Sequence, residues 1–139
     1  MSSTESADIW KGGKVTEQGK GQTGQARNVR VWVNGEAVDA AAASIGALDH
    51  GVTVGDGAFE TCKVINGMPF ASDRHARRLD RSLAGLGLPP ADHSVIDAGI
   101  KAVLAGEPIA SGRLRYTVTG GAGPLGSDRD ASPLTYIVT

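Results

Sequence analysis

The sequence predicts an α+β fold, a two-layer sandwich in which two helices cover one face of a mainly antiparallel sheet. Three observations predict it. Strand-like alternating runs come in pairs closed by Asn-Gly turns, at residues 29–38 and 58–71. Two stretches with helical apolar spacing and two more strand-like runs come after them, at 73–86, 92–104, 114–119 and 134–138.

The composition is that of one modest domain with a core of its own. The chain has 139 residues, of which 40% are apolar and 21% charged. A net charge of −1 gives no basic surface for DNA or RNA. No apolar run approaches the ~20 residues that span a bilayer, and the N-terminus lacks a signal-peptide core. We therefore expect a cytoplasmic protein that binds neither nucleic acid nor membrane.

Residues 1–28 are expected to be a flexible N-terminal extension. Ser, Thr, Gly, Gln and Lys predominate there, and no apolar period is present. An arm that adds a strand to the sheet is the alternative. The folded domain is then expected to span residues 29–139.

The first two hairpins are predicted from alternation and turn chemistry. Residues 29–33 and 36–38 flank Asn34-Gly35, and residues 58–65 and 68–71 flank Asn66-Gly67. Along 58–65 the alternation separates two faces. One face is expected to carry Phe59, Thr61, Lys63 and Ile65, and the other Glu60, Cys62 and Val64.

The first helix is predicted over residues 73–86, with Ser72 or Asp73 as its N-cap. Its buried stripe is expected to be Leu79, Leu83 and Leu86, and Gly87 is expected to end it. The second helix is predicted to run through residue 104 from a cap at Asp92 or Ser94.

A glycine-rich turn and a basic helix start flank the strand at 58–65. The turn contains Gly55-Asp56-Gly57, and Asp49 and His50 before it are read as turn-forming residues. Four arginines lie near the start of the first helix, at positions 74, 77, 78 and 81. A guanidinium fork matches the oxygens of a phosphate, so these parts together can form a pocket for a small anion.

Three motifs in this order resemble the N-terminal domain of the class IV aminotransferases. They are Leu-Asp-His-Gly at 48–51, Gly-Asp-Gly-Ala-Phe-Glu-Thr at 55–61 and His-Ala-Arg-Arg-Leu at 75–79. The resemblance begins at about residue 31. It implies pyridoxal 5′-phosphate as cofactor, a homodimer, and a small-molecule substrate, either an amino acid or aminodeoxychorismate.

The resemblance also implies roles for three residues. Arg78 matches the arginine that binds the cofactor phosphate, and the alternative is an arginine on a solvated helix face. Val54 and Phe59 match positions that line the substrate pocket, although Val54 stands where Tyr is common, and the alternative for both is ordinary core. No metal site is expected, because no carboxylate or cysteine cluster at ligand spacing accompanies the three histidines.

The reaction suggested by the resemblance depends on Gly120. D-amino-acid aminotransferases carry an arginine there that binds the substrate carboxylate, so Gly120 favours an aminodeoxychorismate lyase-like enzyme forming 4-aminobenzoate and pyruvate. An amino-acid transaminase is the first alternative, and a non-catalytic interaction domain is the second. In either enzyme, Arg113, Arg115 or Arg129 can supply a carboxylate contact.

The Schiff-base lysine of the family is expected downstream of Thr139, in a C-terminal domain. The five lysines of this chain do not match it: Lys11, Lys14, Lys20, Lys63 and Lys101. The chain alone is therefore expected to contain no catalytic residue and to be inactive.

Overall fold

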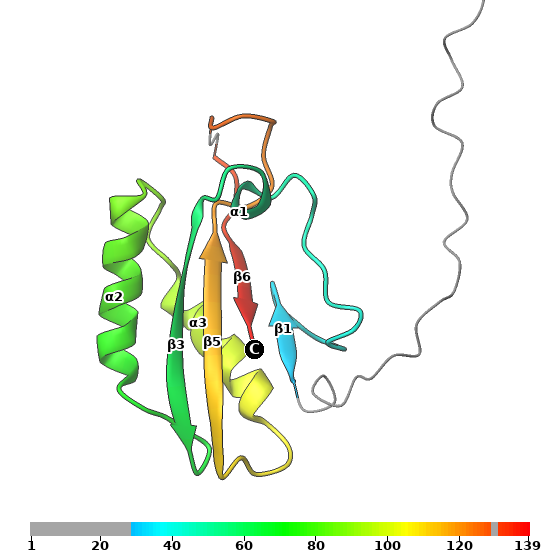
Figure 1. The fold of residues 1–139 in the computed structure, drawn as a ribbon, viewed down its shortest axis with the longest axis vertical. Coiled ribbons are helices and arrows are strands. Elements are labelled where there is room, and N and C mark those ends of the chain that lie inside the picture. The colour runs from blue at the N-terminus through cyan, green and yellow to red at the C-terminus, as the bar shows by residue number, and fades with distance from the viewer. Residues whose placement is uncertain (1–28, 129–130) are drawn as a thin grey trace, which may run out of the picture.

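The computed structural model describes residues 29–128 and 131–139 (Figure 1). The prediction for residues 1–28 and the candidate Arg129 lie outside the described residues. The elements in chain order are β1 (Val31–Val33), β2 (Glu36–Val38), α1 (His50–Thr53), β3 (Gly57–Ile65), β4 (Met68–Pro69), α2 (Ser72–Gly85), α3 (His93–Leu104), β5 (Ser111–Thr119) and β6 (Thr135–Val138).

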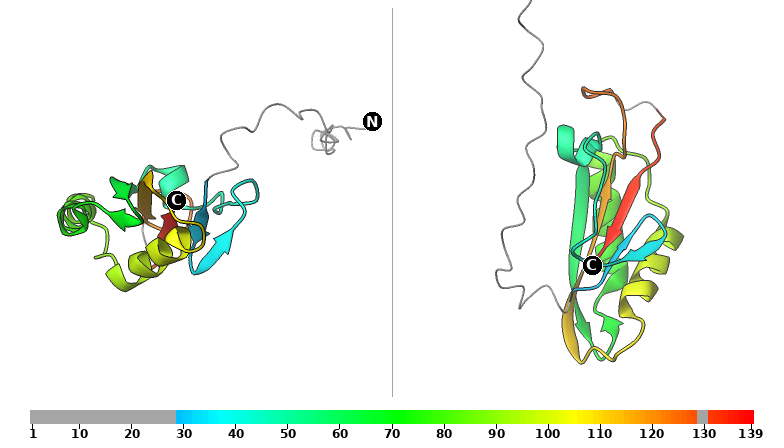
Figure 2. Two further views of the ribbon diagram at one scale, coloured as in Figure 1. Left: turned by 90° about the horizontal axis from the view of Figure 1, so that it is seen from below. Right: turned by 90° about the vertical axis from the view of Figure 1, so that its right-hand side faces the viewer.

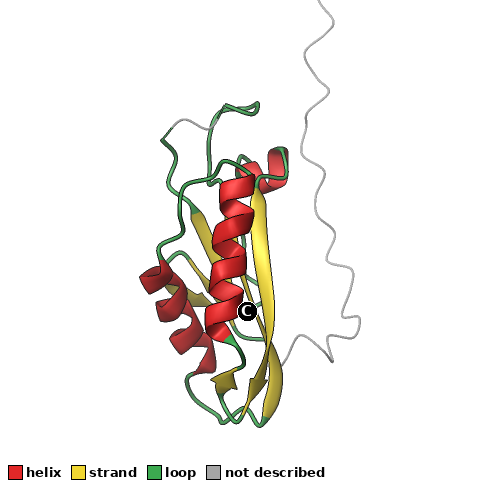
Figure 3. Cartoon of the chain, turned by 90° about the vertical axis from the view of Figure 1, so that its left-hand side faces the viewer, coloured by secondary structure: helices red, strands yellow, loops and turns green. Residues whose placement is uncertain are grey.

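The six strands form one sheet in the order β2-β1-β6-β5-β3-β4, and each neighbouring pair is antiparallel. The long central pair, β3 and β5, runs in register from Gly57 opposite Thr119 to Ile65 opposite Ser111. Helix α2 lies along β3, and α3 packs against β1, β5 and β6 (Figures 2 and 3). The predicted α+β sandwich is therefore confirmed. None of the helices in the described ranges has the length and apolar character needed to cross a bilayer.

The central strands have two unlike faces. Glu60, Cys62 and Val64 are buried on the face that the helices pack against, which we call the covered face. Phe59 and Lys63 are exposed on the opposite face. We call that side the open face and define it by residues 59, 61 and 63 of β3 and 113, 115 and 117 of β5. The predicted alternation of β3 is confirmed.

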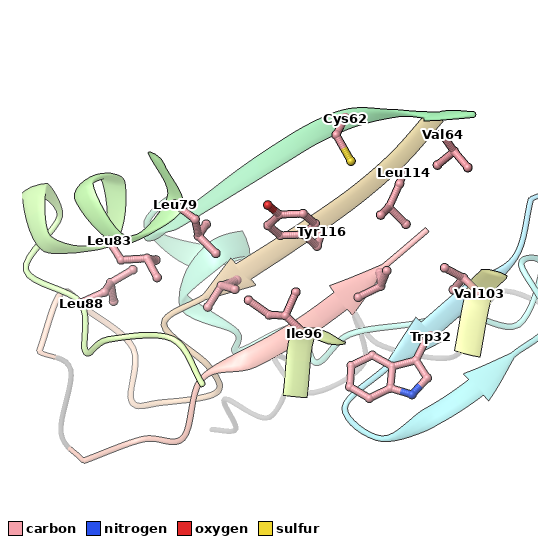
Figure 4. Close-up of a cluster of buried hydrophobic side chains, with 12 residues drawn as sticks. Trp32, Cys62, Val64, Leu79, Leu83, Leu88, Ile96, Val103, Leu114 and Tyr116 are labelled. Atoms are coloured by element: carbon pink, nitrogen blue, oxygen red, sulfur yellow. The ribbon is translucent and has the colours of Figure 1, made fainter. Parts of the chain in front are cut away.

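The core lies between the covered face and the two helices (Figure 4). Its buried members come from all the main elements: Trp32, Cys62, Val64, Leu79, Leu83, Leu88, Ile96, Val103, Leu114, Tyr116, Val118 and Val138. Gly99 permits the close approach of α3, because a Cβ there would lie 2.7 Å from the Trp32 ring and 2.6 Å from Val138. The helix thus packs directly against the indole.

The end of α2 corrects one predicted core residue. Leu86 is 37% exposed, and the helix ends at Gly85. Gly87 has a φ of +68° and reverses the chain, so that the Leu88 N–H donates to the Leu83 carbonyl at 2.9 Å. This pattern brings the residue after the glycine back onto the helix. Leu88 is therefore the buried residue, in place of Leu86.

Two other local predictions were wrong, and a third was incomplete. Neither Ser72 nor Asp73 caps α2, whose N-cap is Ala71 with no side-chain hydrogen bond, while the Ser72 hydroxyl donates to the Pro69 carbonyl. Strand β4 ends at Pro69 rather than residue 71; the Phe70 N–H still donates to the Lys63 carbonyl at 2.8 Å, and Ala71, with a φ of +56°, turns the chain into α2. The turn after Asp49 contains the short helix α1, which is too short for a periodic pattern.

Candidate functional site

The candidate site is built around the carboxylate of Glu60. The alternation of β3 points this side chain toward α2, where it is 3% exposed. His75 and Arg78 lie three residues apart on α2 and so share one side of the helix. The His75 Nδ1 is 2.6 Å from Glu60 Oε2, and the Arg78 Nε is 3.3 Å from Glu60 Oε1. Sequence reasoning named His75 and Arg78 but not the carboxylate that joins them.

Burial explains why these three residues belong together. A buried carboxylate is costly unless hydrogen-bond donors or opposite charges surround it. His75 and Arg78 meet that need, so Glu60 in turn holds both side chains in place. Within residues 29–128 and 131–139, Arg78 is the one arginine of α2 with a carboxylate partner. The side chain is nevertheless 61% exposed, so the phosphate role and the alternative of a solvated helix face both stay open at this point.

The contact with Glu60 leaves most of the Arg78 guanidinium available. The side chain is 61% exposed, and its contact with Glu60 is through Nε. The terminal Nη groups make no ion pair with any described residue. A guanidinium held at one edge, with its donor fork toward solvent, fits a phosphate group. The residues present therefore fit the phosphate of pyridoxal 5′-phosphate.

The motif at 48–51 holds a glycine-rich loop, residues 120–126, at the end of β5. The Asp49 carboxylate accepts from the Gly51 N–H at 2.8 Å and caps α1. The His50 N–H donates to the Gly121 carbonyl at 2.8 Å. The His50 ring is buried, and its Nε2 lies 3.1 Å from the Pro124 carbonyl. Asp49 and His50 thus have structural roles here, as the sequence predicted.

Gly123 explains how the His50 ring fits under the loop. A Cβ at position 123 would lie 2.6 Å from His50 Cε1, so the ring occupies the space that a side chain would need. The other ring nitrogen, Nδ1, is buried without a hydrogen-bond partner among the described residues. Among the described residues, the Pro124 carbonyl is therefore the one hydrogen-bond partner of the His50 ring.

The two predicted pocket residues lie at the surface and not in the core. Val54 is 41% exposed at the end of α1, and Phe59 is 56% exposed on the open face. The Arg115 guanidinium lies 4.3 Å from the centroid of the Phe59 ring. Its Nε donates to the Thr61 hydroxyl at 3.0 Å. Sequence reasoning named Arg115 as a candidate but missed the two residues that hold it.

The covered face holds two ionisable groups that stay neutral. Burial raises the pKa of the Cys62 thiol, and the negative charge of Glu60 adds to the shift. Burial also raises the pKa of Tyr116. A buried thiol with a raised pKa is a poor nucleophile, so we assign neither group a chemical role. Within the described residues, no group of three His, Cys, Asp or Glu side chains is placed to hold a metal ion.

The family model for amino-transferase class IV matches residues 57–139, which is more than half of the chain. The chain belongs to this family. The family is dependent on pyridoxal phosphate, and the matched segment contains Glu60, His75 and Arg78. The match begins at the glycine bend, so the motif at 48–51 lies just before it.

Three class IV relatives show how much of such a protein this chain represents. A candidate branched-chain-amino-acid aminotransferase from Methanocaldococcus jannaschii is 30% identical over 102 residues, 72% of this chain and 35% of the relative. The structure of 4-amino-4-deoxychorismate lyase from Pseudomonas aeruginosa matches with a TM-score of 0.66 and 28% identity, covering 78% and 38% of the two chains. A pyridoxal-phosphate-bound hypothetical aminotransferase from Mycobacterium tuberculosis matches with a TM-score of 0.62 and 26% identity, covering 80% and 38%. The chain thus spans little more than a third of their length.

Proposed function

We propose that this chain forms the phosphate-binding part of a class IV pyridoxal-phosphate site, with Arg78 as the phosphate ligand. The observation that carries the proposal is the position of Arg78. A buried carboxylate holds its Nε, and its Nη groups remain free to donate. Arg77, one position earlier, is exposed and has no such anchor among residues 29–128 and 131–139. When bound, the cofactor supplies a ring that stabilises negative charge on the substrate carbon.

In the same proposal, Phe59 and Val54 line the substrate cavity. Both side chains are large, apolar and exposed, so they can contact a bound molecule without any change in the core. Val54 provides no hydroxyl where relatives often have Tyr, so substrate contact there is apolar. In this proposal, none of the five lysines of this chain is the reactive lysine of the site.

For the reaction, we propose an aminodeoxychorismate lyase-like activity that releases pyruvate and 4-aminobenzoate. Gly120 is the observation that favours it. A Cβ at this position would lie 3.2 Å from His50 Cβ and 3.4 Å from Leu88, so the packing leaves little room for an arginine. The substrate carboxylate would then need a partner elsewhere. A lyase and an aminotransferase match this chain with the same TM-score of 0.66, so the choice rests on Gly120, and amino-acid transamination is the alternative.

An activity assay on the whole protein, with pyridoxal 5′-phosphate added, tests the reaction. One sample receives aminodeoxychorismate, and another receives an amino acid with 2-oxoglutarate. Pyruvate together with 4-aminobenzoate supports the lyase, whereas glutamate supports the transaminase. Neither product, with the cofactor present, contradicts both and leaves a non-catalytic interaction domain. Light scattering on the same sample tests the proposed homodimer, since the mass should be twice that of the chain.

Two variants link the activity to Arg78. Arg78→Gln should weaken cofactor binding about 10- to 100-fold, because charge-assisted hydrogen bonds to the phosphate are lost. Arg77→Gln removes the same charge from the neighbouring position and should leave binding unchanged. Equal losses in the two variants would show that the helix acts only through its overall charge.

A further inference from the structure

A hollow of about 210 Å³ lies between α2, α3 and the covered face of the sheet, and we call it the crevice. Asp73 and Ala76 of α2 line it, and so do Ile96, Asp97 and Ile100 of α3. Residues three and four positions apart share one side of a helix. The two helices therefore turn these sides toward a common space, which neither the proposed phosphate site nor the proposed substrate cavity uses.

The base of the crevice carries a hydroxyl group among apolar atoms. Tyr116 lines it together with Cys62 and Leu114 (Figure 4). Tyr116 is only 4% exposed, and its hydroxyl makes no hydrogen bond within residues 29–128 and 131–139. A buried hydroxyl without a partner is costly, so a ligand that offers a partner relieves that cost. Burial also raises the pKa of Tyr116, which keeps the phenol neutral and able to donate.

The solvent side of the crevice is acidic. Asp73 and Asp97 line it from the two helices, and both are exposed. Neither forms an ion pair with a described residue, although a basic residue follows each by four positions. His93 also lines the crevice, but its Nε2 lies 2.8 Å from the Asp80 carboxylate. The two carboxylates of the crevice therefore keep their oxygens available for a cation.

We propose that the crevice binds a small hydroxylated aromatic amine, with its ammonium group at Asp73 and Asp97 and its hydroxyl at Tyr116. The apolar walls hold the ring, since an apolar cavity of about 150 Å³ is large enough for benzene. The volume of about 210 Å³ leaves room for a short side chain and excludes a molecule as large as pyridoxal 5′-phosphate. The inference is independent of the proposed function, because neither Arg78 nor Phe59 lines the crevice.

Three ligands that differ by one group test the inference on the chain itself. Tyramine has both polar groups, phenethylamine lacks the hydroxyl, and 4-ethylphenol lacks the amine. Each is titrated at low salt, without cofactor, while the amide signals of Ala76 and Ile96 are followed by NMR. Tyramine should bind about threefold or more tighter than phenethylamine, through one neutral hydrogen bond, and about tenfold or more tighter than 4-ethylphenol, through charge-assisted bonds. The absence of either difference would overturn the inference.

Variants assign each polar group of the ligand to its partner. Tyr116→Phe should remove the preference for tyramine over phenethylamine and leave stability in urea undiminished, because the lost hydroxyl had no partner. The double variant Asp73→Asn, Asp97→Asn should remove the preference for tyramine over 4-ethylphenol. Glu36→Gln, an exposed carboxylate on β2, is the matched control and should keep both. Retention of either preference in the variant meant to remove it would also overturn the inference. Because no cofactor is present, failure here and failure of the phosphate site can be told apart.

Discussion

The two faces of the β3–β5 pair are made from alternating residues of the same strands, yet their contents differ completely. On the covered face, Cys62, Val64 and Leu114 pack beneath the helices. On the open face, the neighbouring residues Lys63 and Arg113 are exposed. One face therefore supplies the stability of the domain, while the other displays charge and an aromatic ring that folding does not require.

Glu60 is the exception that connects the two roles. It lies on the covered face, where every other side chain of β3 that is buried is apolar or a thiol. Its carboxylate contacts His75 and Arg78 at the margin of α2. The comparison teaches that a polar residue on an otherwise apolar face is a sign of function when its partners reach the surface.

The largest expected effect is a loss of stability caused by a substitution on the covered face. Leu114→Ala should lower the free energy of unfolding by about 2–5 kcal/mol, since it leaves a cavity among buried side chains. Arg113→Ala, the adjacent residue on the open face, should change it by no more than about 0.5 kcal/mol. Urea unfolding followed by circular dichroism measures both. Similar losses in the two variants would contradict the division into two faces.

Removal of the Glu60 charge should have an intermediate effect. Glu60→Gln should cost about 1.5–3 kcal/mol, the range for a buried hydrogen bond to a charged group. Most of this loss should come from the His75 bond, because solvent screens the exposed Arg78. Glu107→Gln, an exposed glutamate, is the control. A Glu60→Gln variant as stable as the control would show that the carboxylate does not organise the site.

The cap of α3 should have a smaller effect that depends on pH. Hydrogen bonds from the Ser94 side chain and then its N–H lower the pKa of Asp92 below its ordinary 3.8. A carboxyl with a lowered folded pKa stabilises the fold above that ordinary value and loses its effect as the pH falls through the folded pKa. Asp92→Ala should therefore be less stable than wild type at neutral pH, and the difference should shrink below pH 3.8.

Asn at position 92 keeps the capping oxygen without the charge. Asp92→Asn should thus stay close to wild type in urea unfolding and show no such dependence on pH. A stability difference between wild type and Asp92→Ala that grew on acidification would have the wrong sign for this account.

Thiol labelling compares the solvent accessibility of the two faces. Cys62 is buried, and burial raises its pKa, so a thiol reagent should react with it only after unfolding. Lys63→Cys in a Cys62→Ala background moves the thiol to the open face and should react in the native state. Rapid native labelling of Cys62 would mean that the covered face opens readily.

The fold was predictable because period-2 and helical patterns report directly on burial. Alternation along β3, both Asn-Gly turns and the Asp92 cap followed from local chemistry. The exchange of Leu86 for Leu88 did not, since it depends on the chain reversal at Gly87. Local propensity cannot say which residue the reversal brings back to the core.

The site was predictable only in part. The motif at 75–79 pointed to Arg78, but the partner that positions it comes from another element, fifteen residues away from His75. The sequence did contain a signal for that partner: the alternation of β3 places Glu60 on the same face as Cys62 and Val64, where a carboxylate needs a paired charge or a hydrogen-bond donor. The contacts that Phe59 and Thr61 make with Arg115 had no such signal, because they depend on the register of β3 and β5.

The central claim is that Arg78 binds the cofactor phosphate, and a comparison of two ligands tests it most directly. Pyridoxamine 5′-phosphate and pyridoxamine differ by the phosphate, and both lack the aldehyde that reacts with lysines. Equilibrium binding to wild type, Arg78→Gln and Arg77→Gln should show a preference for the phosphorylated ligand that only Arg78→Gln loses, by about tenfold or more. The same preference in all three proteins would contradict the account.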